Sequence, residues 1–211
     1  MSILSVKELT YGYNDCPVFK NFWVSFSKGK IYCIVGENGA GKTTLLKCIS
    51  SLINNSKGIY YENQSIEENK DLLQNISYIM SEDTLYPYMT VNENIKFYAT
   101  LFYKTSNFKN KVNGILTQLG CDIYRDYLVK NLSQGTRNKI YLSIMLSKDA
   151  EIFLLDEPFT ALDKKSQEFF FNFIEEKNRK EKSTFIIVTH IEEFKKISSE
   201  IIEIHKLREE V

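Results

Sequence analysis

Short apolar runs separated by polar turns predict a series of β-strands along this chain. Residues 31–35 and 152–155 are continuously apolar, which is typical of strands buried on both faces. Three more segments have a similar character, at residues 76–80, 184–188 and 201–204. Helical patterns lie between the later strands, at residues 164–178 and 191–196. This alternation predicts an α/β fold with a mainly parallel sheet and helices on both of its faces.

The first part of the chain predicts a second, smaller sheet. Residues 57–61 predict a short strand of their own. Residues 2–9 and 18–26 form two short strand-like stretches, and turns at residues 11–15 and 27–29 follow them. Closely spaced strands joined by short turns favour antiparallel pairing. We therefore predict an N-terminal antiparallel β subdomain beside the main sheet.

A capping motif predicts the start of a helix near the middle of the chain. Thr90 can act as N-cap, and Glu93 stands three residues later, as in a capping box. Four apolar residues then recur at helical spacing and predict a buried face: Val91, Ile95, Tyr98 and Phe102. Three others lie off that face and are available either for a partner or for packing inside the subdomain: Phe97, Leu101 and Tyr103.

Further helical patterns extend this region. One covers residues 109–119, and another begins at Ser133. We therefore expect residues 82–148 to be an inserted all-helical subdomain. Residues 1–81 and 149–211 are assigned to the α/β core with its antiparallel subdomain, so the chain is interpreted as a single domain.

The charge balance argues against a nucleic-acid-binding protein. The chain has 211 residues, with 27 Lys and Arg and 27 Asp and Glu, so its net charge is zero. Binding to a nucleic-acid backbone depends on clustered positive charge. The cysteines are scattered without a C-x-x-C pair, which predicts buried, reduced thiols rather than disulfides or zinc ligands: Cys16, Cys33, Cys48 and Cys121.

No stretch of the sequence predicts a membrane span or a secretory signal. The apolar runs are far shorter than the ~18 residues that a transmembrane helix needs. The first residues lack the apolar core of a signal peptide. We therefore expect a cytoplasmic protein, in which any membrane role is peripheral and depends on a partner.

Residues 36–43 fit the phosphate-binding P-loop pattern G-x-x-x-x-G-K-[ST], between a predicted strand and a predicted helix. Glycines let backbone N–H groups turn towards a polyphosphate, and the helix N-terminus adds the positive end of its dipole. Lys42 can hold the outer phosphates, and the Thr43 hydroxyl can ligate Mg²⁺. The expected nucleotide-binding residues are Gly36, Glu37, Asn38, Gly39, Ala40, Gly41, Lys42, Thr43 and Thr44.

Two adjacent carboxylates follow the strand at residues 152–155. Asp156 and Glu157 stand at the carboxyl end of this strand, the edge where open α/β sheets bind ligands. Asp156 can hold Mg²⁺ directly or through water. Glu157, pointing the other way along the pleat, can orient or deprotonate an attacking water. A surface turn with two solvated acids is the alternative, and the P-loop in the same chain argues against it.

Together these motifs resemble the ATP-binding cassette (ABC) ATPases, over nearly the whole chain and in the family's order. Leu132-Ser133-Gln134-Gly135 is similar to the family signature, and Thr160-Ala161-Leu162-Asp163 resembles the D-loop. His190, which follows the strand at 184–188, stands where the family has its switch histidine. At a helix start, Ser133 and Gly135 can also present N–H groups to an anion, although Ser133 could serve only as an N-cap.

The resemblance also extends to the base-binding side of the site. Tyr13 falls where the family has an aromatic residue that stacks on adenine, and Val18 can add an apolar contact. Tyr11 is a competing candidate two residues away.

The resemblance implies Mg²⁺-dependent hydrolysis of ATP by in-line attack of water. Lys42 and the loop amides would stabilise charge, while Thr43 and Asp156 would hold the metal. Glu157 would be the base, and His190 would sense the γ-phosphate. The family signature is read by the opposite subunit, which implies a homo- or heterodimer of cassettes around two ATP. The residues that would contact ATP in trans are Ser133, Gln134 and Gly135.

Two departures from the family pattern stand out. The family usually has Gln, which reaches Mg²⁺, where this chain has Ser81; the shorter hydroxyl would need a bridging water to reach the metal. In the signature, Gln134 replaces the first of two glycines and tolerates positive φ less well, and Thr136 replaces a common Gln. We therefore expect slow ATP hydrolysis by the isolated chain.

Three functional classes fit the resemblance. The first, which we favour, is the ATPase subunit of a transporter with a separate permease, whose coupling helix the family places between the helical subdomain and the core. We expect no regulatory domain after Val211, and such a chain would resemble the compact exporter-type cassettes. The second class is a soluble ABC ATPase of iron–sulfur cluster assembly. The third acts on DNA or ribosomes, and the zero net charge argues against it.

Overall fold

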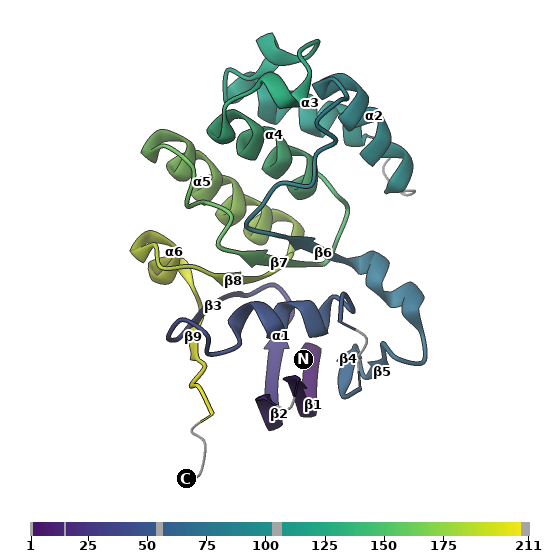
Figure 1. Ribbon diagram of the computed structural model, residues 1–211, viewed down its shortest axis with the longest axis vertical. Helices are drawn as coiled ribbons and strands as arrows, with labels where there is room; N and C mark the ends of the chain where they lie inside the picture. Colours follow the sequence, from purple (N-terminus) through teal and green to yellow (C-terminus); the bar gives the residue numbers. More distant parts are fainter. Residues whose placement is uncertain (1, 15, 54–56, 103–106, 208–211) are drawn as a thin grey trace.

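The computed structural model describes residues 2–14, 16–53, 57–102 and 107–207, which form two β-sheets and the helices around them (Figure 1). The larger sheet crosses the middle of the molecule. Most helices lie on one side of it, and the smaller sheet lies on the other.

A five-stranded parallel sheet forms the centre. Its strands are β3 (Ile31–Val35), β6 (Ile76–Ile79), β7 (Ile152–Asp156), β8 (Thr184–Val188) and β9 (Glu200–Glu203). They are ordered β6-β7-β8-β3-β9, and each neighbouring pair is parallel. The apolar runs therefore pair as their pattern indicates, and the predicted α/β fold is confirmed.

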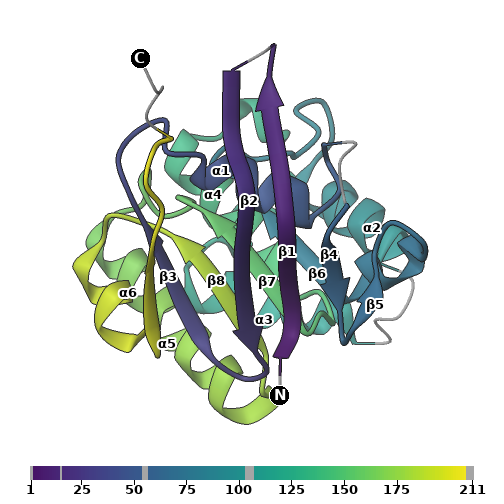
Figure 2. The ribbon, with the colours of Figure 1, turned by 90° about the horizontal axis from the view of Figure 1, so that it is seen from below.

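The predicted antiparallel sheet is also present, with two differences from the prediction. It contains β1 (Ser2–Tyr13), β2 (Cys16–Ser27), β4 (Ile59–Tyr61) and β5 (Gln64–Ser65), in the order β2-β1-β4-β5. β1 and β2 form a long ribbon across the parallel sheet (Figure 2). The predicted turn at residues 11–15 is wrong for Tyr11–Tyr13, because cross-strand pairing with β2 carries β1 to Tyr13. β5 was not predicted, since two residues carry no periodic signal.

Between β6 and β7 the described chain is helical. It contains α2 (Val91–Leu101), α3 (Phe108–Gln118), α4 (Gln134–Leu146) and the 3-10 turns η2 (Asp122–Tyr124) and η3 (Val129–Asn131). The capping box is confirmed, because Thr90 Oγ1 accepts from the Glu93 N–H at 3.2 Å and Glu93 Oε2 accepts from the Thr90 N–H at 2.7 Å. Phe102, predicted for the buried face, is the C-cap of α2, while Tyr103, predicted to lie off that face, is outside the described residues.

The remaining helices flank the parallel sheet. α1 (Lys42–Ile49) lies between the two sheets, whereas α5 (Lys164–Glu181) and α6 (Glu192–Ile197) lie on the side of α4 (Figure 1). The 3-10 helix η1 (Lys70–Asn75) precedes β6. α5 is longer than the predicted 164–178, because no helix-breaking residue follows Asn178 and Lys182 takes the left-handed cap.

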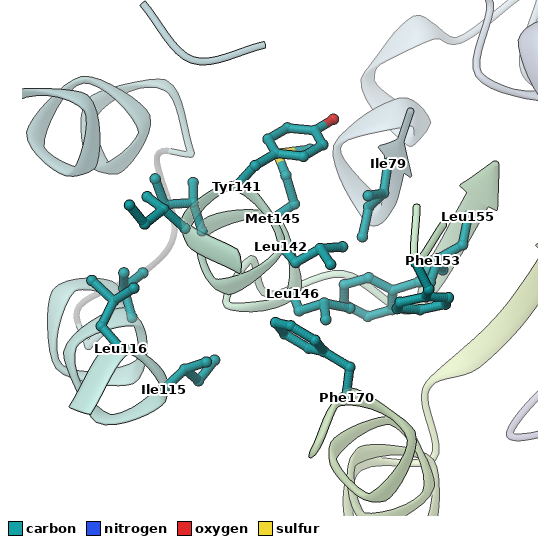
Figure 3. Packing of buried hydrophobic residues seen from close by; sticks show 14 of the residues in the cluster. Ile79, Ile115, Leu116, Tyr141, Leu142, Met145, Leu146, Phe153, Leu155 and Phe170 are labelled. Carbon is teal, nitrogen blue, oxygen red and sulfur yellow. The ribbon is translucent and has the colours of Figure 1, made fainter. Parts of the chain in front are cut away.

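Side chains of the parallel sheet alternate between two apolar cores. On β7, Phe153 and Leu155 belong to the core shared with α4 and α5, and Leu154 belongs to the core shared with α1 and the small sheet. Figure 3 shows the first core, where Leu146 of α4 and Phe170 of α5 meet Phe153. The backbone of the sheet therefore separates two packing layers.

One prediction about the cysteines is wrong. Cys33, Cys48 and Cys121 are buried, and burial raises the pKa of the Cys33 and Cys48 thiols to about 11. Cys16 is exposed instead, because it begins β2 at the tip of the ribbon, where it pairs with Tyr13. Among the described residues, no helix is both long and apolar enough to cross a membrane.

Candidate active site

The loop from Gly36 to Gly41 connects β3 to α1 and passes close to its neighbours. A Cβ added at Gly36 would lie 2.3 Å from the carbonyl oxygen of Ile204. Gly41 has φ of 99°, and its Cβ would lie 2.6 Å from Cγ1 of Val18. Glycine at these two positions therefore lets the loop pass close to Ile204, just after β9, and to Val18 of β2.

Lys42 is the first residue of α1 and is buried at the base of this loop. Its Nζ donates hydrogen bonds to the carbonyl oxygens of Gly36 at 2.8 Å and Glu37 at 3.0 Å. A lysine ammonium has three donors, so one remains for a phosphate oxygen. Gly41 caps α1 without a side-chain hydrogen bond, which leaves the first N–H groups of α1 for an anion.

Asp156 ends β7 on the face that α1 covers, so its carboxylate meets the start of that helix. Asp156 Oδ1 accepts a hydrogen bond from Thr43 Oγ1 at 3.0 Å, and Oδ2 accepts one from the Tyr78 hydroxyl at 3.2 Å. Only 5% of Asp156 is exposed, and burial raises the pKa of its carboxyl, which the Thr43 and Tyr78 hydroxyls oppose. In the described part of the chain no cation forms an ion pair with Asp156.

The donor set fits Mg²⁺ bound together with phosphates. A buried carboxylate that has only hydroxyl partners can accept a cation, and Asp156 and Thr43 are the side chains that would hold it. Within the described ranges no three His, Cys, Asp or Glu side chains form a metal cage. Mg²⁺ commonly uses one or two carboxylates, water and substrate phosphates instead. When bound, it would neutralise charge on the phosphates.

Glu157 does not continue the pleat of β7 as the sequence predicted. Its φ is 49°, a left-handed conformation, and its N–H donates to the carbonyl oxygen of Val188 at 2.9 Å. This turn after β7 places Glu157 Oε1 3.4 Å from His190 Nε2. The prediction of pleat alternation is wrong because the strand ends at Asp156, but the turn brings together two of the predicted catalytic residues.

The tip of the β1–β2 ribbon carries the predicted adenine-binding residues. The rings of Tyr11 and Tyr13 meet edge to face, with centroids 5.1 Å apart. Tyr11 packs against the core shared with α1, whereas 45% of Tyr13 is exposed. Val18 is half-buried beside Gly41. An exposed ring is the one that can stack on a base, so the geometry favours Tyr13 over Tyr11.

The signature-like segment forms the start of α4. Ser133 is the N-cap, and its Oγ accepts from the Thr136 N–H at 3.2 Å. Gln134 is the first helical residue and is not among the residues with positive φ, so the backbone does not require glycine there. A Cβ at Gly135 would lie 3.4 Å from the carbonyl oxygen of Ala161. The two segments that resemble the signature and the D-loop are therefore neighbours.

Comparison with known proteins decides the family. A family profile described as ABC transporter matches residues 19–160. This chain belongs to the ABC transporter family. It is a nucleotide-binding domain of that family, an ATP-binding cassette with the P-loop fold.

Relatives of the cassette cover most of its length. It is 30% identical over 210 residues to the ergothioneine transport ATP-binding protein EgtV of Helicobacter pylori, covering 98% of this chain and 99% of that protein. It is 32% identical to the ABC transporter ATP-binding protein NatA of Bacillus subtilis, over 86% of this chain and 76% of the relative. A dimeric cassette solved in a post-hydrolysis state with ADP and Pi has a TM-score of 0.83 at 22% identity, with 97% of both chains covered.

Ser81 is exposed, and no hydrogen bond joins it to Thr43 or Asp156 within the part of the chain that the structure describes. Its place in the metal site through a bridging water stays a prediction. Tyr78 is a second direct partner of Asp156, besides Thr43, and sequence reasoning missed it. Tyr78 stands 78 positions before Asp156, and only the register of β6 against β7 brings them together.

Proposed function

We propose that the cassette binds ATP with Mg²⁺ and hydrolyses it as the ATPase subunit of a transporter. The observation that carries this proposal is the convergence of three segments at the carboxyl edge of the sheet. The P-loop supplies Lys42 and Thr43, β7 ends in Asp156, and the turn after β7 places Glu157 beside His190.

Each side chain has a chemical role in this proposal. Lys42 and the loop N–H groups bind the phosphates, and Thr43 with Asp156 holds Mg²⁺. Glu157 orients or deprotonates the attacking water. His190, whose side chain is 59% exposed, is free to turn towards a γ-phosphate. Tyr13 and Val18 contact the base.

We propose further that two cassettes enclose two ATP molecules. Ser133 and Gln134 are exposed and Gly135 is half-buried, so a second cassette can present this helix start to the phosphates bound by the first. The dimeric cassette with ADP and Pi supports the idea through its shared fold. The second cassette is either another copy of this chain or a different one.

Glu157→Gln tests this proposal directly. The amide keeps the shape of the carboxylate but cannot take a proton, so we expect hydrolysis to fall at least ~100-fold. ATP should therefore remain bound, and size-exclusion chromatography with ATP and Mg²⁺ should show a stable dimer. Glu176→Gln changes an exposed carboxylate on α5 and serves as control, with hydrolysis unchanged.

The hydrolysis rate tests the role of Glu157, and size-exclusion chromatography tests the composite site separately. Full hydrolysis by Glu157→Gln would contradict the role of Glu157. Loss of hydrolysis without a dimer at any ATP concentration would contradict the composite site, at least for a homodimer.

An apolar groove on the cassette supports the proposal that it works with a permease. A cavity of about 300 Å³ lies between the helical segment at residues 82–148 and the core. Both sides contribute apolar side chains to its wall, among them Leu52, Tyr78, Tyr98, Leu101, Tyr141 and Met145. Leu52 is 60% exposed and Leu101 is 51% exposed, so apolar surface is available at the rim.

A groove of this kind accepts the apolar face of a short helix. We propose that a cytoplasmic helix of the permease docks here, with residues 82–148 moving as one subdomain against the core. The permease would then hold the cassette peripherally at the inner face of the cell membrane. We also propose export as the direction of transport.

A further inference from the structure

Tyr78 belongs to both the groove and the metal-binding end of the sheet. Its ring is part of the groove wall, and its hydroxyl donates to Asp156 Oδ2 at 3.2 Å. Of the described residues, Tyr78 is the one that lines the groove and also forms a hydrogen bond with Asp156. The groove and the metal-holding carboxylate are thus separated by a single side chain.

The register of the sheet explains this position. In the parallel pairing of β6 with β7, Tyr78 stands beside Leu154, two residues before Asp156. Residues two apart on a strand share a face, so Leu154 and Asp156 both point towards α1. The phenol of Tyr78 is long enough to reach forward from the level of Leu154 to the carboxylate, whereas a phenylalanine in the same place would end short of it.

The two hydrogen bonds to Asp156 come from different parts of the molecule. Thr43 Oγ1 binds Oδ1 from the nucleotide side, and the Tyr78 hydroxyl binds Oδ2 from the groove side. Partners of this kind fix the orientation of a metal ligand, and their loss typically costs about 10- to 100-fold in metal affinity or activity. The exposed side chain of Ser81 makes no such contact among the described residues.

We propose that Tyr78 is a positioning residue that couples the groove to Asp156 in this cassette. A helix that enters the groove presses on the ring, and the ring can move only by changing its hydrogen bond to the carboxylate. Metal binding at Asp156 acts on the groove through the same contact, because the coupling free energy is reciprocal. The proposal rests on the proposed function in taking a permease helix as the occupant of the groove.

The first test measures metal binding by the purified cassette, without a permease. Mn²⁺ is titrated by electron paramagnetic resonance in the presence of a non-hydrolysable ATP analogue. Tyr78→Phe removes only the hydroxyl, so we expect the half-saturating Mn²⁺ concentration to rise about 10-fold. Binding of the analogue in EDTA should be unchanged. Tyr32→Phe is the matched control, since the Tyr32 hydroxyl lies in the same sheet but accepts from the Ser27 N–H.

The second test measures the fluorescence of a label placed in the groove. Leu52→Cys carries an environment-sensitive fluorophore in a Cys16→Ser background, which removes the one exposed thiol among the four. We expect Mn²⁺ with the ATP analogue to change the fluorescence in this protein and in its Tyr32→Phe form. The change should be lost when Tyr78→Phe is added.

Two results would overturn the proposal. One is unaltered Mn²⁺ affinity in Tyr78→Phe, and the other is a groove signal that persists in that variant. Tyr78→Met fills the same wall without a hydroxyl and should match Tyr78→Phe; if Met impairs binding and Phe does not, packing of the ring rather than its hydrogen bond is responsible, and the proposal fails. A failure to bind a permease would leave both tests intact, so the two proposals fail separately.

Discussion

Gly41 shows how a single residue shapes the nucleotide site. It stands at the junction of the P-loop and α1, with φ of 99°, and a Cβ there would lie 2.6 Å from Val18 Cγ1 and 3.0 Å from Phe19 Cζ on β2. The absence of a side chain thus serves both the backbone conformation and the approach of the ribbon that carries the adenine-binding residues.

Gly41→Ala should weaken nucleotide binding more than Gly39→Ala. Both glycines have positive φ, so alanine costs ~1–3 kcal/mol of backbone strain at either position. Only at Gly41 would the new Cβ also meet Val18, whereas nothing lies within 4 Å of a Cβ at Gly39. We expect at least a tenfold difference between the two dissociation constants, measured with a fluorescent ATP analogue. Equal affinities would show that contact with β2 is unimportant.

At this scale the sequence predicts what is local and misses what is not. The P-loop residues are adjacent in the chain, so strand, glycines, Lys42 and Thr43 follow from one short pattern. Tyr78 and the left-handed turn at Glu157 depend on strand register and on where β7 ends. Neither of these is encoded in a window of a few residues.

At the scale of elements, the start of α5 joins two helices. Asp163 is the N-cap of α5, and its Oδ1 accepts from the Ser166 N–H at 2.9 Å. Its Oδ2 lies 2.7 Å from Nζ of Lys139 on α4. Lys139, followed by the Ser166 N–H, holds the pKa of Asp163 well below its usual range.

Asp163→Ala should lower the free energy of unfolding by about 1 kcal/mol at pH 7, since it removes the cap. Asp163→Asn keeps a capping oxygen and loses the charge, so it should lower the free energy of unfolding by less than Asp163→Ala does. The reason is that the half-exposed ion pair with Lys139 contributes little to stability. Because the folded pKa is depressed, the wild-type contribution is present above about pH 4 and disappears as the pH falls through the folded pKa. Urea unfolding at pH 7 and pH 3 measures this. A difference between Asp163→Asn and wild type that is as large at pH 3 as at pH 7 would contradict it.

Element types were easier to predict than their ends. The strands of the parallel sheet and the capped helix at Thr90 agree with their patterns, because burial on both faces and a capping box are strong local signals. The end of β1 was misplaced because Tyr11–Tyr13 carries turn-forming Gly12, yet pairing with β2 extends the strand. Long-range pairing there outweighs the local preference.

At the scale of the whole molecule, the groove is assembled from segments distant in sequence. Leu52 follows α1, Tyr78 belongs to β6, and Leu101 ends α2. The sequence indicated unexplained apolar residues near Leu101 but not the opposite wall. Only the packed arrangement of the helical segment on the core shows that both walls are apolar.

Leu101→Glu should weaken binding of a permease at least tenfold, because docking an apolar helix there would bury an unpaired charge. The partner for this test is the permease, which we expect to be encoded by the gene beside this one and to have about six transmembrane helices. Co-expression of the two proteins and co-purification in detergent measure their association. Ile123→Glu is the control, since Ile123 is 69% exposed on η2 and does not line the groove. Equal recovery of the membrane protein with both variants would exclude this groove as the docking site.

The parallel sheet separates two apolar cores, and this separation affects how the sequence of such a protein can change in evolution. Phe153 and Leu155 belong to the core shared with α4 and α5, here called the helical layer. Leu154 belongs to the core shared with α1 and the small sheet, here called the nucleotide layer. Substitutions at distant sites that share no partners add nearly independently to stability. The helical layer can therefore drift in sequence to suit a different partner at little cost to the nucleotide layer. Tyr78 lines the groove and also donates a hydrogen bond to Asp156, so we expect fewer substitutions to be tolerated at this position.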